Sequence, residues 1–124
     1  MAVPKSVVTD TELSVLKLLW ERPALSARDI ATHLYEEVNP SSMGTVQKLI
    51  ARLEEKEMLA RNHRQTPHRF EATLTREDIA GMQLEDFADR LSEGSLSPFV
   101  LHLVQAEKLS KSDREEIRRL LEDG

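Results

Sequence analysis

The clearest pattern of apolar and polar positions in this 124-residue chain runs from Ser41 to Leu53. Four apolar side chains recur there at the spacing of an α-helix, namely Val46, Leu49, Ile50 and Leu53. At about 100° per residue, the opposite side carries Gly44, Lys48 and Ala51, flanked by Thr45, Gln47 and Arg52. Small residues allow close approach, and amide and ammonium groups can bond base edges or phosphates. The segment predicts a helix that lies in a DNA major groove, although an amphipathic helix with a solvated face has the same pattern.

Two further helices are predicted before this stretch, and both begin with the sequence signature of a capping box. The pairs are Thr9 with Glu12, for a helix that reaches about Glu21, and Ser26 with Asp29, for a helix that reaches about Glu36. Ala24-Leu25 between them is short and could form a single β bridge. Asn39–Ser42 is a turn that also caps the third helix.

After Leu53 the pattern changes from the period of a helix to that of a strand. Residues 58–64 and 68–74 alternate on either side of a turn at Gln65-Thr66-Pro67, which predicts a β-hairpin with basic residues at its tip. Three helices followed by a basic hairpin, or wing, is the order of a winged helix-turn-helix, in which the wing contacts DNA backbone beside the recognition helix. The candidate DNA-contacting residues are Ser42, Met43, Thr45, Gln47, Lys48, Arg52, Arg61, His63, Arg64 and Arg69.

Residues 75–124 predict three more helices with more apolar surface than so short a segment can bury alone. The predicted starts are Thr75 with Asp78, Ser97 with Pro98, and Ser112 with Glu115. A dimer would cover this surface, and docking onto the first domain is the alternative. The candidate interface residues are Leu84, Phe87, Leu91, Phe99, Val100, Leu103, Val104, Ile117, Leu120 and Leu121. We expect a mainly α protein with a small β-hairpin wing: a winged helix-turn-helix at 1–74, then a short three-helix dimerisation domain at 75–124.

The net charge of −5 opposes nucleic-acid binding, but its distribution weakens that objection. Residues 1–74 hold ten Lys/Arg and ten Asp/Glu, whereas residues 75–124 hold seven and twelve. Residues 48–69 alone hold six basic and three acidic side chains. A locally basic face on an acidic protein is compatible with a DNA-binding domain joined to an acidic domain.

Composition also bounds the location of the chain. No stretch approaches the 18 or more apolar residues of a membrane span, so we expect no membrane segment. Residues 1–5 lack the apolar run of a signal peptide. The absence of cysteine excludes disulfides and Cys-based metal or redox chemistry and is compatible with a reducing cytosol.

Catalytic and metal chemistry find little support in the sequence. No nucleophile lies beside a base, and no glycine-rich phosphate loop is present, so we expect neither an enzyme nor a cofactor. His63 and His68 flank the predicted wing turn and could share a metal, but no Cys or carboxylate completes a ligand set at metal spacing. His102 fits a core or interface position, where a pH-sensitive contact is conceivable.

The ordered series of segments resembles the penicillinase-repressor family of the BlaI/MecI type. The similar segments are Thr11–Glu21, Leu25–Ile30, Thr45–Leu53, Gly94–Leu96, Val100-Leu101, and Glu107–Ser110 up to Leu120-Leu121. No single motif is diagnostic, but their order with the short helical tail is fairly specific. The resemblance implies a cytoplasmic transcriptional repressor, a homodimer that binds palindromic operators of antibiotic-resistance or stress operons. It places Thr45, Gln47 and Lys48 in the groove and Arg52 at a phosphate.

Three departures from the family pattern matter. Glu57 stands where the turn after the third helix usually has Gly, so either the turn differs or it carries roughly 1 kcal/mol of strain. The family implies a sensor protease as partner, which cleaves the best-known members at an Asn-Phe bond. The matching pair here is His102-Leu103, which speaks against that partner. The C-terminal cysteines of copper-responsive relatives are absent, which excludes copper sensing by that route.

Two other functions stay open at this point. The first is an adaptor that uses its winged helix only for protein contact, without specific DNA binding. The acidic overall charge of the chain supports this alternative. A ligand-responsive regulator of the multiple-resistance type usually needs a longer N-terminal dimerisation helix and a ligand cleft between domains. The sequence shows neither clearly.

Overall fold

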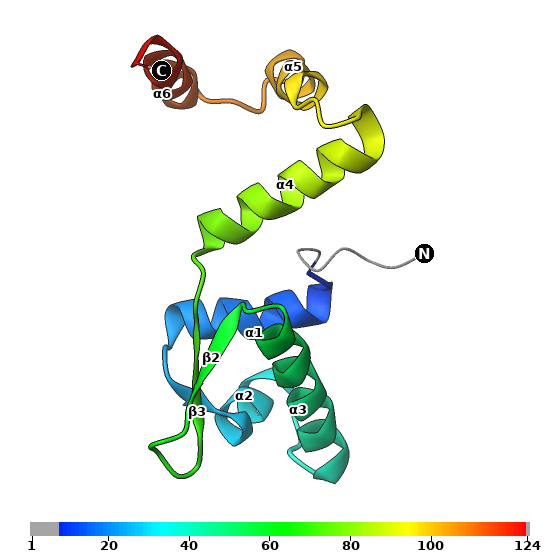
Figure 1. Ribbon diagram of the computed structural model, residues 1–124, viewed down its shortest axis with the longest axis vertical. Coiled ribbons are helices and arrows are strands. Elements are labelled where there is room, and N and C mark those ends of the chain that lie inside the picture. Colours follow the sequence, from blue (N-terminus) through cyan, green and yellow to red (C-terminus); the bar gives the residue numbers. More distant parts are fainter. Residues whose placement is uncertain (1–7, 124) are drawn as a thin grey trace. The chain divides into compact units, whose positions relative to one another are not determined.

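The computed structural model describes residues 8–123, so the N-terminal residues 1–5 considered above lie outside the described part. The elements, in chain order, are α1 (Asp10–Glu21), β1 (Leu25–Ser26), α2 (Ala27–Leu34), α3 (Pro40–Glu55), β2 (Leu59–Asn62), β3 (Arg69–Ala72), α4 (Arg76–Ser92), α5 (Ser97–Gln105) and α6 (Lys111–Asp123) (Figure 1). This mainly helical fold with a β-hairpin wing confirms the expected class. The chain divides into two compact units after Asp86, inside α4, whereas the sequence predicted a division between residues 74 and 75.

Local capping decides where the helices of the first unit begin. Within each capping pair, the side chain of either residue accepts a hydrogen bond from the backbone N–H of the other, which satisfies amide donors that a helix start leaves unpaired. The pairs are Thr9–Glu12 for α1, Ser26–Asp29 for α2, Asn39–Ser42 for α3 and Thr75–Asp78 for α4. These four predicted starts are confirmed, although α2 ends at Leu34 and not near Glu36.

The predicted starts of α5 and α6 are wrong. Leu96 is the N-cap of α5, without a side-chain cap bond, and Ser97 is already helical. At α6, Ser110 and Asp113 exchange the two cap bonds, each at 3.0 Å, in place of Ser112 and Glu115. A serine followed three residues later by a carboxylate occurs twice in this stretch, so local spacing could not select the correct pair.

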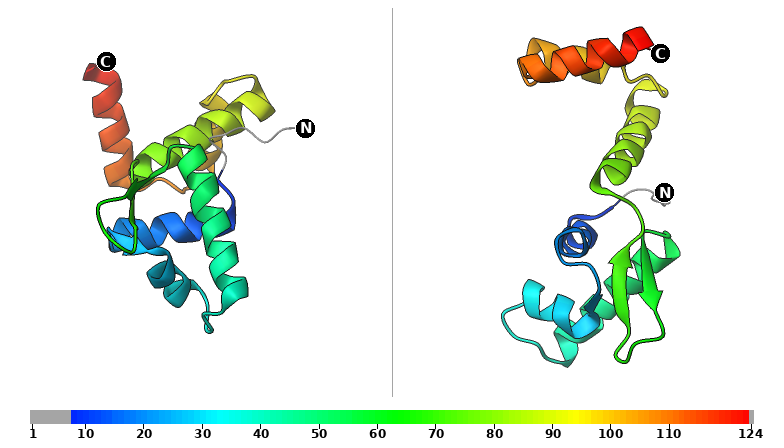
Figure 2. Two further views of the ribbon diagram at one scale, coloured as in Figure 1. Left: turned by 60° about the horizontal axis from the view of Figure 1, so that its bottom comes forward. Right: turned by 90° about the vertical axis from the view of Figure 1, so that its left-hand side faces the viewer.

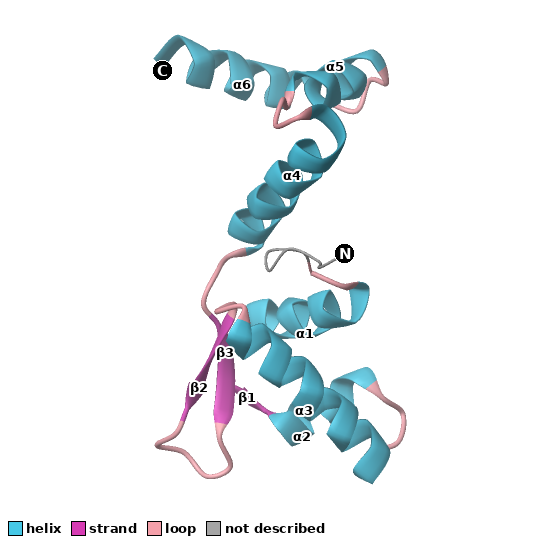
Figure 3. Cartoon of the chain, turned by 45° about the vertical axis from the view of Figure 1, so that its right-hand side comes forward, coloured by secondary structure: helices cyan, strands magenta, loops and turns pink. Residues whose placement is uncertain are grey.

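The described residues form a small antiparallel sheet in the order β1-β3-β2 (Figure 3). The β2–β3 hairpin places Leu59 opposite Ala72, and β1 adds to the other edge of β3 with Leu25 opposite Phe70. The predicted bridge at Ala24-Leu25 is therefore a short strand that begins one residue later. Because β1 directly precedes α2, the sheet connects the wing to the helix pair α2–α3.

The core of the first unit lies where α1, α2 and α3 meet the sheet (Figure 2). The predicted stripe of α3 is buried, with each of its four side chains at most 3% exposed. The buried apolar residues are Val15, Leu16, Leu19, Ile30, Ala31, Val46, Leu49, Ile50, Leu53, Met58, Leu59, Phe70 and Ile79. Since one side of α3 packs into this core, its opposite side faces solvent.

A tight turn ends α3 and holds Glu57 at a φ of 61°. The Glu57 N–H donates to the Glu54 carbonyl at 3.0 Å, and the Met58 N–H donates to the Leu53 carbonyl at 2.9 Å. These two bonds define a Schellman motif, and the buried side chains of Leu53 and Met58 supply the apolar contact that often accompanies it. The turn is thus the one that glycine favours, and Glu57 adopts it with a Cβ that opposes the left-handed conformation.

A buried ion pair joins the start of α1 to the end of α3. Glu12 is 1% exposed, and its carboxylate accepts hydrogen bonds from Lys56 Nζ at 2.8 and 2.9 Å and from the Thr9 N–H at 3.0 Å. Burial alone would raise the pKa of Glu12, but the hydrogen bonds from Lys56 and Thr9 and the charge of Lys56 outweigh it and lower that pKa. Because Lys56 is the C-cap of α3, the pair fixes this end of the helix against α1.

We predict that Glu57→Gly raises the free energy of unfolding by about 0.5–1 kcal/mol, because relief of the left-handed strain exceeds the extra entropy that glycine gives the unfolded chain. Urea unfolding followed by circular dichroism measures the change. Glu57→Ala is the matched control, since it removes the same carboxylate and keeps a Cβ. Equal stabilisation by both substitutions would mean that the charge, and not the backbone, is the cause.

We predict that the stability contributed by Glu12 is present at neutral pH and is lost as the pH falls through its lowered folded-state pKa, which lies below the ordinary value of 4.5. Glu12→Gln should therefore be less stable than the unmodified chain at about pH 7, and the difference should shrink towards about pH 3. Urea unfolding across this range measures it, with the exposed Asp10→Asn as control. A difference that does not change with pH would contradict the assignment.

Candidate nucleic-acid interface

The solvent-facing side of α3 carries the polar residues that the helical period predicted. Thr45, Gln47, Lys48 and Arg52 are all exposed. Lys48 and Arg52 form no ion pair with another described residue, so their charges are available to a ligand. The Thr45 hydroxyl donates to the Ser41 carbonyl at 3.1 Å, so it is engaged with the backbone of its own helix. This face can therefore offer amide, ammonium and guanidinium donors to one surface.

Two candidate residues of the same helix point inward instead. Ser42 is buried, its N–H donates to Asn39 Oδ1 at 2.9 Å, and its hydroxyl lies 3.1 Å from the carbonyls of Glu37 and Asn39. Met43 is half-buried and packs against the core. Ser42 precedes Val46 by four residues and so falls on the buried side of the helix. The packing of both side chains within the protein speaks against the predicted DNA contacts of Ser42 and Met43, which stay predictions.

Arg61 is held by neighbouring side chains. Its Nε and Nη2 donate to the carboxylate of Glu54 at 3.2 and 2.8 Å, and its Nη1 donates to Nδ1 of His68 at 3.2 Å. The guanidinium also lies over the Phe70 ring, 4.8 Å from the ring centroid. Arg61 therefore has a role inside the protein, where it joins the wing to the last turns of α3, and its predicted phosphate contact stays a prediction.

Arg69 has a similar role inside the protein, whereas His63 and Arg64 at the wing tip make no ion pair with a described residue. Arg69 Nη1 donates to the Ala24 carbonyl at 2.9 Å and lies 3.5 Å from Asp29 Oδ2, so it connects β3 to the start of α2. His63 and Arg64 are exposed at the turn of the hairpin. Of the four wing residues predicted to contact DNA, these two are exposed, whereas Arg61 and Arg69 are half-buried, with side chains 31% and 40% exposed.

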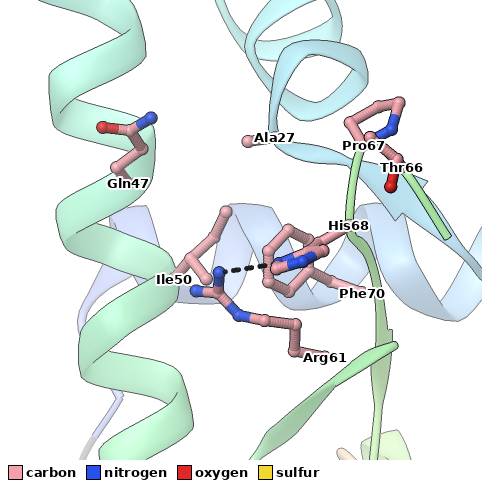
Figure 4. A pocket seen from close by; sticks show the side chains of 8 residues that line it. All are labelled: Ala27, Gln47, Ile50, Arg61, Thr66, Pro67, His68 and Phe70. Atoms are coloured by element: carbon pink, nitrogen blue, oxygen red, sulfur yellow. Dashed lines mark hydrogen bonds between the residues drawn. The ribbon is translucent and has the colours of Figure 1, made fainter. Parts of the chain in front are cut away.

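A hollow that the sequence did not reveal lies between α3 and the wing (Figure 4). Its volume is about 440 Å³. Gln47 and Ile50 line it from α3, and Arg61, His68 and Phe70 line it from β2, β3 and the turn between them. The residues come from three separate segments of the chain, so no local pattern could have indicated it.

Apolar side chains cover much of the second unit and the adjoining end of the first. Nine of the ten candidate interface residues are exposed, from 37% for Ile117 to 77% for Leu121. Phe99 is the exception, because its ring lies 5.4 Å from that of Phe87, centroid to centroid. Leu96 and Leu101 are exposed as well and were not among the candidates. Exposed apolar surface of this extent is typical of an interaction site.

The described residues 8–123 show no metal cluster. No group of three or more His, Asp or Glu side chains within that range could hold a metal ion. The rings of His63 and His68 pack edge to face with centroids 5.0 Å apart, and no third ligand from the described residues joins them. No helix in the same range is long and apolar enough to cross a membrane.

Comparison with known proteins identifies the family of the chain. A sequence profile described as "Penicillinase repressor" matches residues 8–123. The chain is 26% identical over 125 residues to a penicillinase repressor of Staphylococcus aureus, covering 99% of this chain and 97% of that protein. It is 25% identical over 118 residues to a penicillinase repressor of Bacillus licheniformis, covering 94% and 90%. It is also 25% identical over 114 residues to the methicillin resistance regulatory protein MecI of Staphylococcus aureus strain N315, covering 92% of each.

Among solved structures, a MarR family protein from Bacillus stearothermophilus aligns with a TM-score of 0.48 and 20% identity, over 90% of this chain and 76% of that chain. A likeness this distant does not indicate what the chain does. The profile match, by contrast, spans all but the first seven residues and the last. The predicted resemblance is confirmed, and the chain belongs to the penicillinase-repressor family.

Proposed function

We propose that this chain is a sequence-specific transcriptional repressor that binds a palindromic operator as a homodimer. In this proposal it acts in the cytoplasm without a cofactor and controls a resistance or stress-response operon. The names of its relatives, a penicillinase repressor and a methicillin resistance regulatory protein, support this class of target. A sensor protease is not part of the proposal, because His102-Leu103 replaces the expected cleavage pair.

The observation that carries the proposal is the exposed polar side of α3 beside an accessible wing tip. Gln47 can bond base edges, and Lys48 and Arg52 can bond base edges or phosphates. His63 and Arg64 on the wing would contact the backbone next to the groove. Since the opposite side of α3 is locked in the core, the contacts would be made by a helix that does not need to reorient.

The second unit would join two copies of the chain. Many leucine, valine and isoleucine side chains of its helices are exposed, and no other described part of that unit covers them. A symmetric dimer would bury them and would place two copies of α3 at half-sites about 10 bp, or a multiple of that, apart. Each half-site alone would supply only part of the affinity, so dimerisation and operator binding would be coupled.

The alternative function is an adaptor that uses the winged helix for protein contact. One observation favours it: Lys56, Arg61 and Arg69 each lie in an ion pair with a carboxylate, which lowers the net positive potential of residues 48–69. The remaining cations of this stretch, Lys48, Arg52 and Arg64, make no ion pair with a described residue. They would have to supply the attraction to DNA.

We predict that Lys48→Ala and Arg52→Ala each weaken operator binding roughly tenfold or more. Each substitution should also reduce the slope of log affinity against log salt concentration by about 1 for every phosphate interaction that it removes. Fluorescence anisotropy at several salt concentrations measures both quantities. Lys17→Ala, an exposed lysine of α1, is the matched control and should bind as the unmodified chain does. Unchanged affinity in both α3 variants would rule out this face as the recognition surface.

We predict that Leu103→Asp and Leu121→Asp separate the dimer, because each places a charge in the proposed apolar interface. Sedimentation velocity at micromolar concentration measures the oligomeric state. Gln105→Asp, at an exposed polar position of α5, should remain a dimer. If both leucine variants sediment like the unmodified chain, another surface must join the copies.

A further inference from the structure

The hollow between α3 and the wing has the size and lining of a small-molecule site. Its volume of about 440 Å³ falls within the range of about 300–1,000 Å³ that ligand pockets occupy. Four apolar side chains form part of the wall: Ala27, Ile50, Pro67 and Phe70. Four polar side chains complete it: Gln47, Arg61, Thr66 and His68 (Figure 4). Apolar walls with a few convergent polar groups are the usual composition of such sites.

The polar groups of the wall are mainly hydrogen-bond donors. Arg61 can only donate, so its bond to His68 requires Nδ1 of His68 to accept, and the neutral ring then carries its hydrogen on Nε2. Of the five N–H groups of Arg61, three are used in the hydrogen bonds to Glu54 and His68, which leaves two. The Gln47 amide and the Thr66 hydroxyl add further donors. None of the described residues that line the hollow carries a carboxylate.

We propose that this cavity binds a small organic anion, in which a carboxylate is joined to an apolar, preferably aromatic, body. The carboxylate would accept hydrogen bonds from Arg61, His68 and Thr66, and the apolar body would lie against Ala27 and Pro67, beside the small exposed edges of Ile50 and Phe70. A phosphate of the DNA backbone fits less well, because it has no apolar part to place against these side chains. The site therefore favours a small amphipathic molecule over DNA itself.

The position of the cavity gives its occupant a regulatory effect. Gln47 belongs both to the proposed recognition face of α3 and to the cavity wall, and Thr66 and Pro67 belong to the turn of the wing. An occupant would engage Gln47 and hold the wing away from its DNA-contacting position, and so would lower operator affinity. This second step rests on the proposed repressor function, whereas binding of the anion does not.

The test begins with the full chain in the absence of DNA. Titration with 2-naphthoate, followed by backbone and His68 ring resonances, is expected to give saturable shifts that centre on Thr66, His68 and Phe70. The neutral 2-naphthamide is expected to bind at least about tenfold more weakly. Absence of saturable shifts with millimolar naphthoate, or equal binding of the amide, would overturn the proposal.

Three variants locate the site. Arg61→Gln is expected to weaken naphthoate binding about tenfold, whereas Arg22→Gln, an exposed arginine of equal charge outside the cavity, should leave it unchanged. Ala27→Leu fills the cavity from the α2 side without altering a polar group, and it is expected to abolish naphthoate binding. Because this variant keeps Arg61, it tests the site even if Arg61→Gln loosens the wing. Thermal melts confirm that each variant is folded. Equal affinity in all three would overturn the assignment.

A second titration adds DNA. Naphthoate is expected to lower the operator affinity of the unmodified chain several-fold. The operator affinity of Ala27→Leu should be the same with and without naphthoate. If naphthoate binds the cavity but does not change DNA affinity, the regulatory step is overturned. If the chain binds no DNA at all, the proposed repressor function fails, and the titration without DNA still decides whether the cavity is a site for organic anions.

Discussion

Burial of one side of α3 is the constraint on which the first unit depends. Val46, Leu49, Ile50 and Leu53 pack into the core with α1, α2 and the sheet. At about 1.5–3 kcal/mol for each buried aliphatic side chain, these four contribute roughly 6–12 kcal/mol, an upper estimate. No single surface contact approaches this value, so α3 cannot rotate to present another face. The direction in which Gln47, Lys48 and Arg52 point is therefore fixed by residues on the other side of the helix.

Ion pairs then fasten the neighbours of α3 to it. Glu12 and Lys56 join its end to α1, and Glu54 and Arg61 join its last turns to the wing. In the first pair the side chain of Glu12 is 1% exposed and that of Lys56 is 17% exposed, whereas both side chains of the second pair are about one-third exposed. Loss of one partner from the first pair would therefore cost more stability, because it would leave a buried charge unpaired. Basic residues near α3 thus have two separate uses. Some hold α3 and the wing in place, and others remain available to a negatively charged ligand.

The sequence predicted the features that depend on near neighbours in the chain. The apolar stripe of α3, four capping pairs and the alternating hairpin follow from spacings of two to four residues, and the structure contains all of them. Prediction failed where two local solutions competed, as at Ser110 and Ser112, and where the deciding partner lies far away. Asp29 is forty positions from Arg69, and the hollow beside Gln47 needs three segments to meet. Glu57 shows a mixed case, because the family pattern indicated an unusual turn and only the backbone angle showed that the strained form is adopted.

The most direct test of the account is to capture genomic DNA fragments with the purified chain at two salt concentrations and to sequence what is retained. A repressor whose exposed α3 face reads DNA should retain one or a few palindromic sites, with an affinity far above that for bulk DNA at the higher salt. Retention of nothing, or equal retention of all fragments with a steep loss as salt rises, would contradict sequence-specific repression. The winged helix would then serve in protein contact or in non-specific binding.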